Sequence, residues 1–310
     1  MASNYHSFAS TRPRDFSILA EKLERTATTG DSLRIPTMQT SALVDRELRS
    51  SLAWNNCSTP HFNLNYELDR FERREIDSVM KLLEQSYSSI FSQTHEAFAD
   101  RLEMYLVDAR SQMLLGRKLS SHLNVEEKTL YLTRLPYQPL HAQIIAHLTH
   151  AMRMSRFAKN YEACQAWALM EDAFAVFLNH RLAVQPETFP FFGIEPDIIV
   201  HELMKNGRVR SLHECWEAPA SCNVLERQVL NGAFFLYLGD TYSDDKVVEL
   251  SKCDSDLSVE TFKQFFGKSL DELEAEWVSH LPTSMLAMTR DELDLAITRW
   301  EKKIDSHLWC

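Results

Sequence analysis

The scarcity of glycine constrains this chain more than any other feature, since only seven of its 310 residues are glycine. Tight turns and phosphate-binding loops depend on glycine, because it adopts positive φ angles at little cost. Rossmann and P-loop folds both need such glycine-rich turns, so the sequence argues against them. The segment Gly267-Lys268-Ser269 matches the end of a P-loop, but Phe262 stands where that motif has its first glycine. We therefore interpret it as a helix boundary, with Gly267 ending one helix and Ser269 and Glu272 forming a capping box.

Charge and composition exclude further function classes. The chain has 33 Lys and Arg against 44 Asp and Glu, and its formal net charge of −11 disfavours binding to nucleic-acid phosphates. No apolar run approaches the roughly 20 residues of a membrane helix, so we expect no membrane partner. The first residues show no apolar signal segment, and the six scattered cysteines contain no CxxC pair. We expect reduced thiols and a cytoplasmic location.

The pattern along the chain predicts two parts. Residues 1–55 are rich in Ser, Thr and Arg and weakly periodic, which indicates an arm or loosely docked extension. We expect one domain over residues 56–310, with a sheet lobe over about 56–158 and a helical lobe over about 159–310.

Three short segments have the composition of strands: 61–66, 102–107 and 129–133. A helix is predicted near 70–91, because apolar residues recur there at helical spacing. We expect the three strands to form one sheet that packs on this helix.

The remainder of the chain is predicted to be helical. Residues 140–182 contain no proline or glycine, and their pattern predicts two helices broken near 157–160. Later helical segments are expected near 196–206, 222–250, 258–266, 270–280 and 290–307. The fold class is therefore α+β, mainly helical, with a small sheet lobe followed by a helical lobe.

A carboxylate interrupts the apolar face of the second paired helix. Glu171 lies at helical spacing with Trp167, Phe174 and Leu178, all of which are apolar. A buried carboxylate needs a cation, a metal or several hydrogen bonds. The preceding helix offers His147 and His150, three residues apart. Glu171 could thus join a His/His/Glu metal site, or pair structurally with one of these histidines or with an arginine.

These two helices resemble a known family. The segment IIAHLTHAM, followed by AWALMEDAFAVFL, resembles the helix pair of gluzincin-type zinc metallopeptidases of the MA-like peptidase superfamily. That family carries HExxH on the first helix and a zinc-binding Glu on the second, and Glu171 matches that Glu. The likeness covers roughly residues 60–281. It implies a zincin-like fold and a zinc site at the helix pair.

The chain departs from the family at its central motif. Alignment with HELTH puts Ala146 at the first zinc ligand, His147 at the general base and His150 at the second ligand. A one-residue shift would instead let His147, His150 and Glu171 bind a metal together. Activation of a bound water would then depend on the metal alone or on another acid such as Glu162 or Asp172.

Two other segments are weaker candidates. His201 and Glu202 begin an HExxH-like pattern that ends at Lys205, so we interpret them as structural. Cys215 follows His213 by two residues, which is too local to indicate a catalytic dyad.

The sequence therefore predicts a degenerate metallopeptidase-like protein that binds a peptide or a protein without catalysis, with zinc weakly bound or absent. The alternative is an active zinc-dependent hydrolase or peptidase that uses His147, His150 and Glu171.

Overall fold

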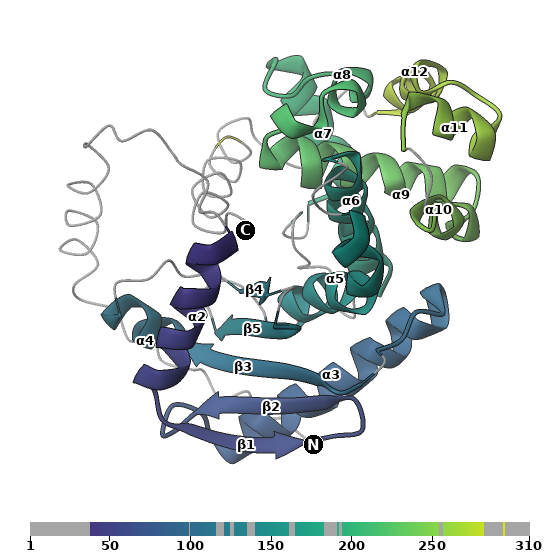
Figure 1. Ribbon diagram of the computed structural model, residues 1–310. Coiled ribbons are helices and arrows are strands. Elements are labelled where there is room, and N and C mark those ends of the chain that lie inside the picture. Colours follow the sequence, from purple (N-terminus) through teal and green to yellow (C-terminus); the bar gives the residue numbers. More distant parts are fainter. Residues whose placement is uncertain are drawn as a thin grey trace, which may run out of the picture. The chain divides into compact units, whose positions relative to one another are not determined.

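The computed structural model describes residues 38–281 with short gaps, together with Asp294. The gaps are residues 99, 116–120, 125–126, 135–139, 161–164, 183–190, 192–193 and 254–256. At residues 38–44, 141–142, 154–160 and 165 only the backbone is described. Met38–Cys310 is one compact unit. Its described residues form an α+β, mainly helical fold, as the sequence predicts (Figure 1).

The sheet has five strands in the order β1-β2-β3-β5-β4. These are β1 (Trp54–Ser58), β2 (Phe62–Glu67), β3 (Leu102–Asp108), β4 (His122–Asn124) and β5 (Thr129–Arg134). The three central strands β2, β3 and β5 run parallel and correspond to the three predicted strands. The edge strands β1 and β4 pair antiparallel with their neighbours. Sequence patterning missed both edges, because they are short and largely polar.

One face of the sheet carries the main core. Phe62 pairs in register with Leu102, and Leu64 pairs with Met104, so these buried side chains share a face. The predicted helix near 70–91 is α3 (Arg73–Thr94), and its Tyr87 lies edge-on to Phe62 with 6.1 Å between ring centroids. The expected packing of this helix on the sheet is confirmed.

A helix covers the other face of the sheet. In α2 (Met38–Ser51), Leu48 packs with Val107 and Tyr131. The carboxylate of Asp45 accepts a hydrogen bond from Asn124 and contacts His122, each at 2.8 Å. Residues 38–55, which composition assigned to the arm, thus include α2, which packs on the sheet, and the start of β1, which is one of its strands.

The later chain is helical, and Figure 1 shows α5 and α6 between the sheet and the helices that follow. The elements are α4 (Ala109–Leu114), α5 (Leu140–Asn160), α6 (Gln165–Leu182), α7 (Pro196–Lys205), α8 (Leu212–Glu217), η1 (Pro219–Ser221), η2 (Leu225–Leu230), α9 (Asn231–Thr241), α10 (Asp244–Ser251), α11 (Val259–Phe266) and α12 (Leu270–His280). The helix expected over 222–250 is divided, because η2 has π-helical turns and a new helix starts after Ser243.

The segment predicted near 290–307 lies outside the described residues apart from Asp294. No described helix is both long and apolar enough to cross a membrane.

The boundary predicted at Gly267 is confirmed. Gly267 follows α11 with φ 76°, a left-handed conformation that favours glycine. Ser269 and Glu272 form the expected capping box at the start of α12.

Helix α6 lies at the centre of the helical part, where it contacts α5, α9, α10 and η2. Helices α6 and α9 approach closely where Gly232 of α9 faces Val176 of α6. A Cβ added to Gly232 would collide with a methyl carbon of Val176. Every residue of α6 from Leu169 to Asn179 is buried. A carboxylate on any face of this helix is therefore removed from water.

Candidate functional site

The helix pair α5 and α6 carries the predicted site residues. His147 and His150 lie on α5, and Glu171 and Asp172 lie on α6. Glu171 is only 1% exposed, so the prediction that it is buried is confirmed. Glu162 lies outside the described residues.

An arginine of α5 holds the Glu171 carboxylate. Arg153 Nε donates to Oε1 at 2.7 Å and to Oε2 at 2.9 Å, and Nη2 lies 2.7 Å from Oε1. The Arg153 side chain has no exposed surface. The buried carboxylate is thus satisfied by a cation, as in one of the alternatives that the sequence left open.

The rest of the Arg153 guanidinium is also engaged. Nη1 donates to Ser251 Oγ at 3.1 Å and to Glu96 Oε2 at 3.4 Å, and Nη2 donates to the Ser251 carbonyl. The guanidinium carbon lies 4.8 Å from the ring centroid of Phe174. These five residues are called the Arg153 cluster below. They join α5, α6, α10 and the segment that follows α3.

Burial shifts the protonation of two groups in this region. It raises the pKa of Glu171 to about 7, while the charge and hydrogen bonds of Arg153 oppose the rise. It lowers the pKa of His150 to about 4, and the positive charge of Arg153 acts in the same direction. His150 is therefore neutral at pH 7, the form of imidazole that can bind a metal.

A small pocket, with room for about one water molecule, is lined by residues of α5, α6 and η2. Its lining includes Ala146 and His150, which lie four residues apart on one side of α5, as the two histidines of an HExxH motif do. Asp172 also lines it, and its Oδ2 lies 3.2 Å from Arg227 Nε. Burial raises the pKa of Asp172, and Arg227 opposes that rise.

The predicted metal ligands do not form a compact set. Within the described part of the chain, one group of three His, Cys, Asp or Glu side chains has ligand atoms that all lie within 4.8 Å of one another: Cys215, Cys222 and Glu226. His147, His150 and Glu171 do not meet this distance. Metal binding by these three residues stays a prediction.

The other sequence candidates have structural partners. Glu202 forms an ion pair with Lys205 at 3.4 Å. His213 contacts Asp271 at 2.7 Å and Glu217 at 3.0 Å, so its ring nitrogens are engaged by carboxylates rather than by Cys215.

Sequence reasoning did not single out Arg153, although a signal was present. In HLTHAMR, Arg153 follows His150 by three residues and therefore shares its side of the helix. A cation on that side is a natural partner for a carboxylate on the facing helix.

Comparison of the sequence with protein-family models and with curated proteins gives no match.

Proposed function

We propose that this chain is a non-catalytic peptide- or protein-binding protein on a scaffold that resembles a zinc metallopeptidase. The Arg153–Glu171 ion pair supports the non-catalytic part of this proposal. The glutamate that the family resemblance assigns to zinc accepts hydrogen bonds from Arg153 on both of its oxygens. The arginine supplies the positive charge that a metal would otherwise provide.

The positive charge of Arg153 disfavours a metal ion beside Glu171. If zinc displaced Arg153 from Glu171, a fully buried guanidinium would lose its main counter-charge. If both cations stayed, they would repel each other in a medium that screens charge weakly.

The residues at the motif positions also limit catalysis. Ala146 has no side-chain atom that can bind zinc, and His147 replaces the glutamate that would accept a proton from the zinc-bound water. General-base assistance is typically worth about 10²–10⁴ in rate. We therefore expect negligible peptidase turnover.

The second candidate is an active zinc-dependent hydrolase or peptidase that uses His147, His150 and Glu171. One observation favours it, because burial keeps His150 in the neutral form that binds zinc.

A turnover assay separates the two functions. The protein, supplied with zinc, is incubated with a random peptide library, and cleavage products are detected by mass spectrometry. The proposal predicts the same background for wild type and for Glu171→Gln. Cleavage that disappears on chelation and in His147→Ala would instead establish the zinc-dependent hydrolase.

The binding half of the proposal has its own test. The same library is passed over immobilised protein, and the retained peptides are titrated against free protein by fluorescence anisotropy. Saturable one-to-one binding of intact peptides is expected, with no dependence on zinc. If no peptide is retained above the level of a heat-unfolded control, peptide binding is refuted.

A further inference from the structure

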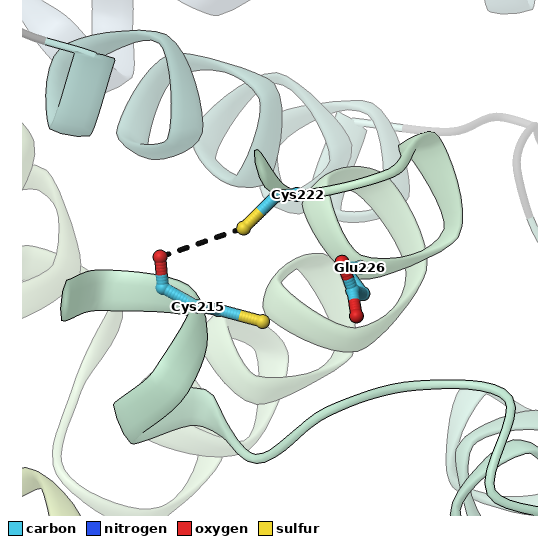
Figure 2. Close-up of side chains that lie close together, drawn as sticks. All are labelled: Cys215, Cys222 and Glu226. Atoms are coloured by element: carbon cyan, nitrogen blue, oxygen red, sulfur yellow. Dashed lines mark hydrogen bonds between the residues drawn. The ribbon is translucent and has the colours of Figure 1, made fainter. Parts of the chain in front are cut away.

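A second buried glutamate lies beside two cysteines in the helical part of the chain. Cys215 and Cys222 are free thiols, and their sulfur atoms lie within 4.8 Å of each other and of a Glu226 oxygen (Figure 2). We propose that Cys215 and Cys222 form a redox-active dithiol, which a hydroperoxide converts reversibly into a disulfide.

Short local elements bring the two thiols together. Cys215 lies in α8, whose start is fixed by a capping box between Ser211 and Glu214. Cys222 follows the single turn of η1 and has an extended backbone. Its thiol donates to the Cys215 carbonyl oxygen at 3.4 Å, the contact drawn in Figure 2. Both cysteines therefore lie on neighbouring short elements, seven residues apart in the sequence, and a disulfide would join parts of one local segment.

The two thiols differ in access and in charge. Cys215 is completely buried, whereas Cys222 is half-buried, so Cys222 is the less enclosed of the two residues. Arg210 Nη2 donates to the Cys222 sulfur at 3.3 Å. A nearby arginine favours the thiolate, which is the form that reacts with peroxides. This geometry makes Cys222 the attacking residue and Cys215 the resolving residue.

The acidities of the thiols agree with these roles. A hydrogen bond from Cys215 lowers the pKa of Cys222, and the charge of Arg210 acts in the same direction, whereas burial and the charge of Glu226 oppose this shift. The pKa of Cys215 is raised, first by its hydrogen bond with Cys222 and then by burial.

A metal fits this group less well, because both Glu226 oxygens are already occupied. Oε1 accepts from the Arg210 backbone N–H at 3.1 Å and from Nε at 2.9 Å. Oε2 accepts from Arg210 Nη2 and from the Asn223 backbone N–H, each at 2.9 Å. A zinc ion would have to break these bonds and lie beside the Arg210 cation, so the two thiols are the reactive part of the group.

The chemistry balances with one hydroperoxide per disulfide. The Cys222 thiolate attacks an oxygen of the peroxide, the O–O bond breaks, and the distal fragment leaves as an alcohol or water after taking up a proton. Cys222 is then a sulfenic acid, oxidised by two electrons. The Cys215 sulfur attacks it, an S–S bond forms, and the sulfenic oxygen leaves as water with the Cys215 proton. An external dithiol reverses the change by exchange.

Peptide mapping of the full chain tests the proposal. The native protein is treated with graded hydrogen peroxide, blocked with iodoacetamide and digested with trypsin, which releases residues 211–227 as one peptide containing both cysteines. We expect this peptide to lose two hydrogen atoms, to resist alkylation, and to regain both thiols with dithiothreitol. This should occur at peroxide doses that leave Cys57 and Cys253 alkylated.

Two variants identify the order of the steps. In Cys215→Ser, Cys222 should stop at the sulfenic acid and react with dimedone, whereas in Cys222→Ser the remaining Cys215 should stay unmodified. Cys57→Ser is the matched control and should behave as wild type. The proposal is overturned if residues 211–227 are oxidised no sooner than Cys57. It is also overturned if the untreated protein binds one zinc per chain that Cys222→Ser removes, since the group is then a metal site.

Discussion

Arg153 and Arg210 make similar ion pairs in two regions of this molecule, with different consequences. Each guanidinium donates to both oxygens of a buried glutamate, Glu171 in one region and Glu226 in the other. The other N–H groups of Arg153 donate to Glu96 and Ser251, and the Arg153 side chain has no exposed surface. The other N–H groups of Arg210 donate to the Ser221 hydroxyl and to the sulfur of Cys222, and the Arg210 side chain is 31% exposed. The Arg153 pair is structural because its other N–H groups bond only oxygen atoms, whereas the Arg210 pair can act on a reactive group because one of its N–H groups bonds a thiol sulfur.

The largest expected difference between the regions is in stability. Arg153→Met leaves the buried carboxylate of Glu171 without its counter-charge, and removing one partner of such a pair costs about 3–5 kcal/mol. Arg210→Met should cost less, because Glu226 keeps two backbone N–H donors and the lost side chain is partly exposed. Urea unfolding of both variants measures the difference.

The double variant Arg153→Met with Glu171→Met is the control for this experiment. It removes the unpaired charge, so it should be less destabilised than Arg153→Met alone. If Arg153→Met and Arg210→Met lower the free energy of unfolding equally, the two ion pairs contribute equally to stability, which would contradict the expected difference.

The pH dependence of stability should have opposite signs in the two regions. Unfolded His150 takes up a proton near pH 6.5, whereas the folded protein resists until about pH 4. Wild type should therefore lose stability relative to His150→Gln as the pH falls through this window, by about 3 kcal/mol in total.

His213, close to Arg210 in sequence, provides the opposite case. Hydrogen bonds with Glu217 and Asp271 raise its pKa, so its contribution is present below about pH 6.5 and is lost as the pH rises through the higher folded pKa. Urea midpoints of wild type, His150→Gln and His213→Gln across the pH range measure both slopes. A flat difference between wild type and His150→Gln would contradict a neutral His150 in the folded protein.

The smallest expected effect concerns reactivity. Arg210→Met removes a hydrogen bond and a positive charge from Cys222, which should raise the pKa of this thiol and slow its alkylation near neutral pH on the order of tenfold. Alkylation of Cys57, followed in the same samples by mass spectrometry, should keep its rate. An unchanged rate at Cys222 would mean that Arg210 does not activate the thiol.

The features that the sequence predicted correctly depend on local patterns. Strands β2, β3 and β5 alternate or run apolar, and the helix pair follows from apolar spacing. The burial of Glu171 follows from its place in an apolar stripe. The cap at Ser269 depends on residues three apart, so it too can be recognised from sequence alone.

The features that were missed depend on how elements are placed in three dimensions. Arg153 and Glu171 are 18 residues apart, and their contact is set by the rotation of α5 against α6, which no periodicity specifies. Cys215, Cys222 and Arg210 meet through two short turns with no repeating pattern. The edge strand β4 has only three residues, too few for alternation to be detected.

The central claim is that Arg153, rather than a metal, provides the charge that Glu171 requires, and a zinc titration tests it most directly. Calorimetry on chelator-treated protein should use a background of Cys215→Ser with Cys222→Ser, so that these thiols cannot bind the metal. The account predicts no stoichiometric zinc binding, and the same trace from the background protein and from its Glu171→Gln derivative. One tightly bound zinc per chain, lost in both His147→Ala and Glu171→Gln, would contradict the account.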